Sequence, residues 1–77
     1  MKYPIFAMKD ELAGFGTPHV VISPEVEERD FKYAMSKDPF SKDKSLWFIG
    51  TFDTDTGEII RHMEKTLEGK PNGENEV

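Results

Sequence analysis

The segment Ser45–Phe52, which reads SLWFIGTF, limits the available folds more than any other part of the sequence. As a strand it would place Leu46 and Phe48 on one face and Trp47 on the other, because successive side chains point to opposite sides. Both faces of this strand are then apolar. Such a strand needs cover on both sides, and a face that the chain leaves open is expected to meet a partner.

The composition indicates that the chain has few apolar residues with which to bury both faces of this strand. Its 77 residues are 36% hydrophobic and 32% charged, which is enough for one domain with a small core. The absence of cysteine excludes disulfides and thiolate metal sites. The sequence has neither an apolar run of membrane-spanning length nor a signal-type start, so we expect a cytosolic protein.

One helix and two further strands are predicted around this segment. The helix spans Pro24–Lys37, because Ser23 is a good N-cap and Pro39 prevents continuation. The strands are Lys2–Lys9 and Glu58–Met63, the latter joined to Ser45–Phe52 by a hairpin loop, residues 53–57, whose glycine can adopt a left-handed conformation. These elements predict an α+β fold, a small, mostly antiparallel three-stranded sheet with one helix packed on one face.

The folded domain is predicted to comprise residues 1–64. Residues 65–77 read KTLEGKPNGENEV and contain only two apolar side chains. Such a segment cannot bury enough surface to offset the entropy lost on ordering, so we expect a disordered polar tail.

A single helix covers only one face of a three-stranded sheet. We therefore expect the second face to form a partner or dimer interface, and an isologous homodimer is the favoured arrangement. Its predicted residues are Trp47, Ile49, Phe6 and Ile59. The alternative is that the tail or the segment Gly14–Ile22 folds over this face and keeps the chain monomeric.

The sequence contains no convincing catalytic or metal-binding motif. Residues 53–64 resemble a calcium loop only superficially, since the glycine stands at the fifth position instead of the sixth. His19 and His62 lie far apart in the sequence and lack a clustered carboxylate pattern. We expect a protein without enzymatic activity, cofactor or metal.

Two groups of residues could contact a nucleic acid or another partner. The first combines Lys37, Lys42 and Lys44 with the aromatic ring of Phe40, and single-strand binders use this combination. Two interleaved aspartates and a net charge of −5 count against a general phosphate-binding surface. The second group is a loop motif that consists of Gly14, Phe15 and Gly16, and it either exposes the Phe15 ring or packs it against the fold.

Three blocks of the sequence, taken in order, carry a family resemblance. The first block is IFAMKD at residues 5–10, continued by GFG at 14–16 and Pro18. The second is ERDF at 28–31 with Ala34 and Met35, and the third is LWFIGTFD at 46–53 with Thr56-Gly57. Together they resemble the small non-structural protein of gokushoviruses, which are single-stranded-DNA phages of the Microviridae. The resemblance covers about residues 1–62, and the chain departs from the family pattern at His19–Ile22 and in its charged tail.

The resemblance implies a non-enzymatic phage accessory protein in the cytoplasm of the infected bacterial host. The family is commonly equated with the microviral C-type protein, which acts on the replication complex and switches synthesis toward single strands and genome packaging. This implies binding to the phage replication complex or to single-stranded DNA. The alternative is a protein-binding module that targets a host factor without contacting DNA.

Overall fold

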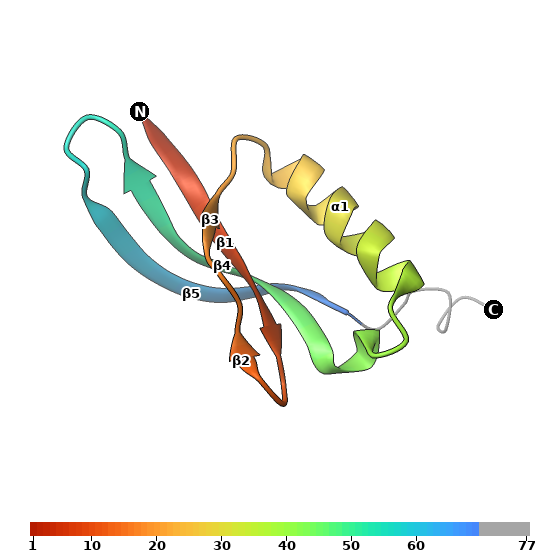
Figure 1. Ribbon diagram of the computed structural model, residues 1–77. Coiled ribbons are helices and arrows are strands. Elements are labelled where there is room, and N and C mark those ends of the chain that lie inside the picture. The colour runs from red at the N-terminus through yellow and green to blue at the C-terminus, as the bar shows by residue number, and fades with distance from the viewer. Residues whose placement is uncertain (70–77) are drawn as a thin grey trace.

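The structure, a computed structural model, describes residues 1–69, in which one long helix lies along one face of an antiparallel sheet (Figure 1). The elements follow one another as β1 (Lys2–Asp10), β2 (Gly14–Phe15), β3 (His19–Val20), α1 (Pro24–Lys37), the 3₁₀ helix η1 (Ser41–Asp43), β4 (Lys44–Asp53) and β5 (Ile59–Glu68).

The ends of α1 follow from local side-chain chemistry. The Ser23 hydroxyl accepts a hydrogen bond from the backbone N–H of Val26 at 3.4 Å, and Pro24 supplies the first helical residue. At the other end the backbone N–H of Asp38 donates to the carbonyl of Met35 at 3.2 Å. The predicted bounds of the helix are confirmed.

The sheet has the strand order β2-β1-β4-β5, and β3 also pairs with β1. All of these pairs are antiparallel. Since β4 pairs with β1 along its whole length, β2 and β3 share the opposite edge of β1. The predicted α+β class is confirmed, but the predicted three-stranded sheet is wrong, because the sheet contains five strands.

The two additional strands come from the segment between β1 and α1, which folds back along the edge of β1. Gly14 starts this return with a φ of 90°. The N–H of Gly16 then donates to the carbonyl of Met8 at 2.7 Å, and the N–H of Val21 donates to that of Pro4 at 2.9 Å. Strands of two residues are too short to show an alternating pattern, and the sequence therefore predicts only a loop and a short extended piece.

The loop between β4 and β5 has the conformation that its glycine allows. Gly57 has a φ of 77°, as predicted from the sequence. The N–H of Asp53 donates to the carbonyl of Glu58 at 2.9 Å, and the N–H of Gly57 donates to the carbonyl of Asp53 at 2.8 Å. The long hairpin therefore closes around one left-handed residue.

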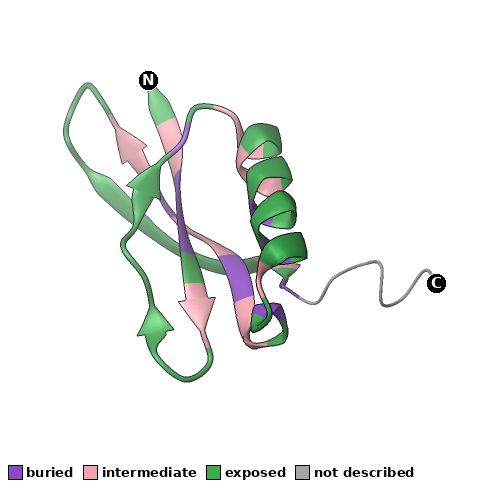
Figure 2. Cartoon of the chain, turned by 45° about the vertical axis from the view of Figure 1, so that its right-hand side comes forward, coloured by how far each residue is buried: buried purple, intermediate pink, exposed green. Residues whose placement is uncertain are grey.

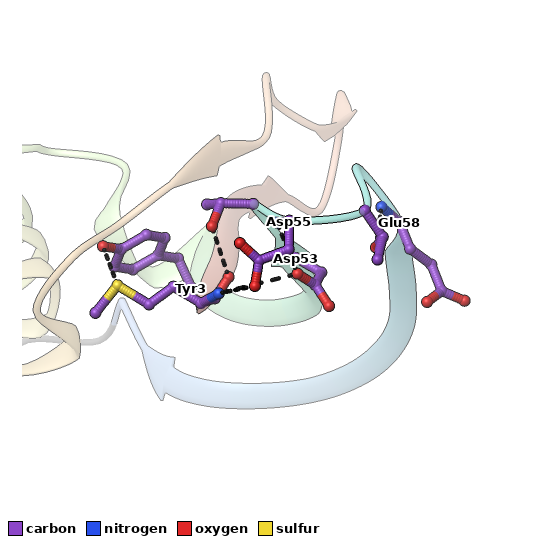
Figure 3. Close-up of polar contacts among 7 residues, drawn as sticks. Tyr3, Asp53, Asp55 and Glu58 are labelled. Carbon is purple, nitrogen blue, oxygen red and sulfur yellow. Dashed lines mark hydrogen bonds and ion pairs between the residues drawn. The ribbon is translucent and has the colours of Figure 1, made fainter.

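The same loop holds the N-terminus (Figure 3). The ammonium of Met1 lies 3.0 Å from Asp55 Oδ2, and the N–H of Thr54 donates to the Met1 carbonyl at 2.8 Å. The backbone N–H of Asp55 donates to Asp53 Oδ1 at 2.9 Å, and this bond, with the nearby ammonium, holds the pKa of Asp53 below its usual value. These contacts fix the beginning of β1 to the end of β4.

The core lies between α1 and the sheet, and Figure 2 shows buried positions on the helix and on the central strands. Its buried members are Phe6, Val21, Phe31, Met35 and Leu46, with Phe48 and Leu67 packed against them. Phe6 is only 3% exposed, so its predicted place on the second face is wrong. Alternation along β1 separates Phe6 from Ile5 and Ala7, but it does not determine which set faces the helix.

The last strand is longer than predicted. β5 continues to Glu68, and Leu67 packs against the core, so residues 65–68 belong to the sheet instead of the predicted tail. The rest of the predicted tail, residues 70–77, lies outside the described residues.

Candidate nucleic-acid interface

The face of the sheet that α1 does not cover, here called the open face, can be followed through the strand pairing. Residues directly opposite each other on paired strands point to the same side of a sheet. Trp47 is opposite Ala7 on β1 and Lys65 on β5, whereas its neighbours Leu46 and Phe48 belong to the helix side. Trp47, Ala7 and Lys65 therefore form one row of the open face.

Four aromatic side chains lie on this face: Tyr3, Phe15, Trp47 and Phe52. Phe15 is opposite Lys9 on β1, and Tyr3 is opposite Phe52 on β4. Phe15 is 45% exposed and the other three are half-buried. Ile5 and Ala7 are buried between these larger side chains, although the helix lies on the other side of the sheet.

Phe15, Trp47 and Lys9 form a compact group, here called the stacking cluster. The rings of Phe15 and Trp47 meet edge to face, with centroids 5.6 Å apart and an interplanar angle of 78°. Lys9 Nζ lies 5.6 Å from both centroids. The indole N–H of Trp47 donates to Ser45 Oγ at 2.9 Å, which fixes the orientation of the indole.

Three basic side chains share the open face: Lys9, Arg61 and Lys65. Lys65 Nζ lies 2.6 Å from Glu68 Oε2, and this hydrogen bond, with the charge of Glu68, raises the pKa of Lys65. Among the ion pairs of residues 1–69, neither Lys9 nor Arg61 has a carboxylate partner. These two cations are therefore available to a ligand.

The acidic side chains are distributed differently. On the long strands, Asp10, Asp53 and Glu64 point to the helix side, because their partners across the sheet belong to that side. Of the strand carboxylates, only Glu68 lies on the open face. The open face is thus more positive than the rest of a chain whose net charge is −5.

Residues 3–69 match the sequence profile of a family described as "Phage ORF5 protein". The chain belongs to the phage ORF5 protein family. The match extends from β1 to the end of β5 and so includes the four aromatic residues of the open face. No curated protein and no solved structure matches the chain. The protein is therefore a phage accessory protein.

The predicted interface residues of this ORF5-family protein occupy three different environments. Trp47 and Ile59 lie on the open face, and Phe6 lies in the core. Ile49 is skipped in the pairing of β4 with both neighbours, so it occupies a bulge. The predicted dimer through this face stays a prediction.

The bulge at Ile49 also changes the side to which the following residues point. Strict alternation along β4 would place Phe52 on the same side as Phe48, but Phe52 is opposite Tyr3 on the open face. Sequence reasoning therefore missed Phe52, and it missed Lys9, Arg61 and Lys65 because their faces depend on strand register. Gly50, an isolated glycine inside a strand pattern, is the one signal that could have indicated the bulge.

The predicted basic group is divided in this ORF5-family protein. Lys44 Nζ forms an ion pair with Asp38, and their hydrogen bond lowers the pKa of Asp38 and raises that of Lys44. Lys37 ends α1, Lys42 is exposed in η1, and Phe40 is 67% exposed between them. This loop offers a second, smaller surface with one ring and two lysines.

The helix side carries a pocket of about 370 Å³ beside α1 and β5. Phe6 and Phe48 contribute apolar lining, while Glu28 and Glu64 contribute carboxylates. His62 Nε2 lies 3.1 Å from Glu64 Oε1 at this side of β5. The pocket lining thus combines two aromatic rings with two carboxylates and with Lys65.

Residues 1–69 hold no candidate metal cluster and no candidate membrane-spanning helix. They contain no group of three or more His, Cys, Asp or Glu side chains placed to hold a metal ion. His19 instead contacts a carboxylate of the helix, with 2.6 Å between Nε2 and Glu27 Oε2. Within the same residues, no helix is both long and apolar enough to cross a membrane.

Proposed function

We propose that this phage ORF5-family protein is a non-enzymatic accessory protein that binds single-stranded DNA during viral genome replication or packaging. The open face carries this proposal, because it combines aromatic rings with cations, the two components of surfaces that bind single strands without sequence preference. The negative net charge does not oppose this binding, since most strand carboxylates lie on the helix side.

The finer assignment, to a gokushovirus of the Microviridae and to a C-type replication and packaging protein, belongs to the same proposal. The three sequence blocks described above support it, and they lie within the matched residues 3–69. The protein would then act in the cytoplasm of the infected bacterium, on DNA or on the phage replication complex.

Binding to DNA can be measured directly with the wild-type chain. We expect fluorescein-labelled dT12 to gain anisotropy on titration at 50 mM NaCl and to bind more weakly at 200 mM. Two or three phosphate contacts give a slope of about −1.4 to −2.1 for log affinity against log salt, at about −0.7 per contact on single strands. No binding at 50 mM NaCl would overturn the proposal.

The role in replication needs a measurement in infected cells. A phage whose copy of this gene carries an early stop codon should accumulate less single-stranded genome relative to its double-stranded replicative form. A plasmid that supplies the wild-type chain should restore the ratio. An unchanged ratio in the mutant would contradict a role in the switch to single-strand synthesis.

A module that binds a host protein is the second candidate, and the pocket beside α1 favours it. Apolar rings and the carboxylates of Glu28 and Glu64 suit a basic peptide with one apolar side chain. A Glu28→Gln/Glu64→Gln variant that binds dT12 normally but fails to support infection would favour this second role. Full infectivity of that variant would count against it.

A further inference from the structure

We infer that the stacking cluster of Phe15, Trp47 and Lys9 is the site at which an unpaired nucleic-acid base stacks, with Arg61 as a further phosphate contact. The ligand is single-stranded nucleic acid lying across the open face from β2 toward β5. This inference rests on the proposed function and adds the place and the mode of binding.

The geometry of the two rings leaves room for a base. In an edge-to-face pair, at most one ring face is occupied by the partner ring, and Phe15 and Trp47 meet at 78°. Phe15 is 45% exposed, and Trp47 is half-buried in spite of its size. Ring surface that the fold does not use is therefore accessible at this cluster.

The indole of Trp47 is also pre-oriented for binding. Its N–H donates to Ser45 Oγ at 2.9 Å, and Ser45 is only 3% exposed. A ring whose orientation is already fixed loses little conformational entropy on binding, which favours affinity. The packing of Trp47 beside the fully buried Ala7 supports the same orientation from the sheet.

Cations accompany the rings along the face. Lys9 Nζ lies 5.6 Å from both ring centroids, where it can meet the phosphate of a nucleotide whose base stacks on the cluster. Arg61 lies on the same face two strands away, on β5, and is exposed. A second aromatic pair, Tyr3 and Phe52, lies four residues away along β1, about 13 Å at a rise of about 3.3 Å per residue.

Two features select an unpaired strand over other occupants. The bases of a duplex are already stacked on both faces, so only an unpaired base can lie on Trp47. A second copy placed face to face would oppose two faces on which cations outnumber carboxylates, whereas a nucleic acid offers the opposite charge. The open face therefore suits a single strand better than a duplex or a homodimer.

The test uses the wild-type chain and its single tryptophan. Titration with dT12 should quench the emission of Trp47, and U12 in a parallel titration shows whether RNA is bound equally. Trp47→Ala should weaken dT12 binding by about 5- to 150-fold, which corresponds to about 1–3 kcal/mol for one stacked base. Trp47→Phe keeps a ring and should retain most of the affinity.

The chain offers a matched control on the opposite side. Tyr33 is 66% exposed on α1, and Lys37 Nζ lies 5.2 Å from its ring centroid, so this pair repeats the ring-and-lysine arrangement away from the open face. Tyr33→Ala should leave the affinity unchanged. Lys9→Gln should weaken binding and make the salt slope about 0.7 less steep.

The outcomes separate this inference from the proposed function. If dT12 binds but Trp47 emission stays constant and both Trp47→Ala and Phe15→Ala bind normally, the stacking site is wrong while DNA binding stands. Phe15→Ala decides the question if Trp47→Ala does not fold. Loss of binding in Phe40→Ala/Lys42→Gln alone would move the site to the loop after α1.

Three other results would also overturn the inference. Equal affinity for dT12 and for a 12-base-pair duplex would exclude stacking of unpaired bases. A wild-type dimer at tens of micromolar in sedimentation, dissociated by Trp47→Glu and not by dT12, would make the open face an interface between copies. No binding of either dT12 or U12 would remove both the inference and the function on which it rests.

Discussion

The two faces of the sheet use the same strands but hold their aromatic side chains in different ways. On the helix side, Phe6 and Phe31 are 3% and 7% exposed, and the helix covers them. On the open face, Phe15 is 45% exposed, and the larger Trp47 ring stays half-buried beside Lys9. Burial alone explains the first group. The second group keeps ring surface in water, which folding does not require.

The two faces of the sheet are constrained by different requirements. A 14-residue helix covers β1 and β4 on one side, and the short strands β2 and β3 lie at an edge of the sheet instead of covering its other side. The choice of side chains on the helix side is therefore limited by packing, whereas side chains on the open face can be suited to a ligand. Variants on the two sides should differ accordingly.

The sharpest form of this comparison uses two aliphatic residues on opposite faces. Leu46 is 1% exposed on the helix side, and Ile59 is 66% exposed on the open face. Leu46→Ala should lower the free energy of unfolding by about 2–5 kcal/mol, because it leaves a cavity, whereas Ile59→Ala should change it by less than about 0.5 kcal/mol. Urea denaturation followed by circular dichroism measures both. Equal losses would mean that the open face is covered in solution.

The hairpin loop joins β4 and β5, which contribute side chains to both faces, so a substitution in the loop should affect the two faces equally. Gly57→Val should lower the stability by about 1–2 kcal/mol, because a β-branched residue is strained at a φ of 77°. A Cβ at this position would meet nothing within 4 Å, so the loss comes from the backbone alone. Thermal melts of this variant and of Gly57→Asn, which tolerates the conformation better, should rank wild type, Asn and Val in that order.

The N-cap of α1 affects the helix side only. Ser23→Ala should lower the stability by about 1 kcal/mol through loss of the bond to the Val26 N–H. The emission maximum of Trp47 in the folded variant should stay that of the wild type, because the indole lies on the other face. An unchanged melting temperature would contradict the cap, and a shifted emission maximum would show that the two faces are coupled.

The smallest expected effect is the pH dependence of the Asp38–Lys44 ion pair, which lies on the helix side. The hydrogen bond from Lys44 lowers the pKa of Asp38 from about 3.8, so its contribution is present above that value and is lost as the pH falls through the lower folded value. Asp38→Asn should therefore melt below the wild type at pH 7, and the difference should disappear in acid. A difference that persists at pH 2 would contradict this origin.

The sequence predicted the elements that are long and have clear end signals. The Ser23–Pro24 start and the Pro39 stop determine α1, and Gly57 determines the hairpin. It did not predict β2 and β3, which form only because the edge of β1 is available to a returning loop. Two-residue strands have no periodicity, so tertiary contacts are their only cause.

The candidate site was predicted only in part, because alternation can be read from the sequence whereas a bulge and the strand register cannot. Trp47 was placed on the second face correctly, because strict alternation relates it to Leu46 and Phe48. Phe52 was not, because the bulge at Ile49 inverts the alternation after it. Lys9 and Arg61 reach the same face only through the register of three strands, and a single sequence does not contain that information.

The pairing of β1 with β4 has a consequence for the order of events during synthesis. Asp10 pairs with Lys44 and Lys2 with Asp53, so β1 leaves the ribosome well before its main partner β4 does. At about 5–20 residues per second, the delay is on the order of seconds. In that interval β2 and β3 are the first segments able to occupy an edge of β1. These two-residue strands thus cover one edge of the nascent β1 before β4 covers the other, so that fewer unpaired backbone groups are exposed.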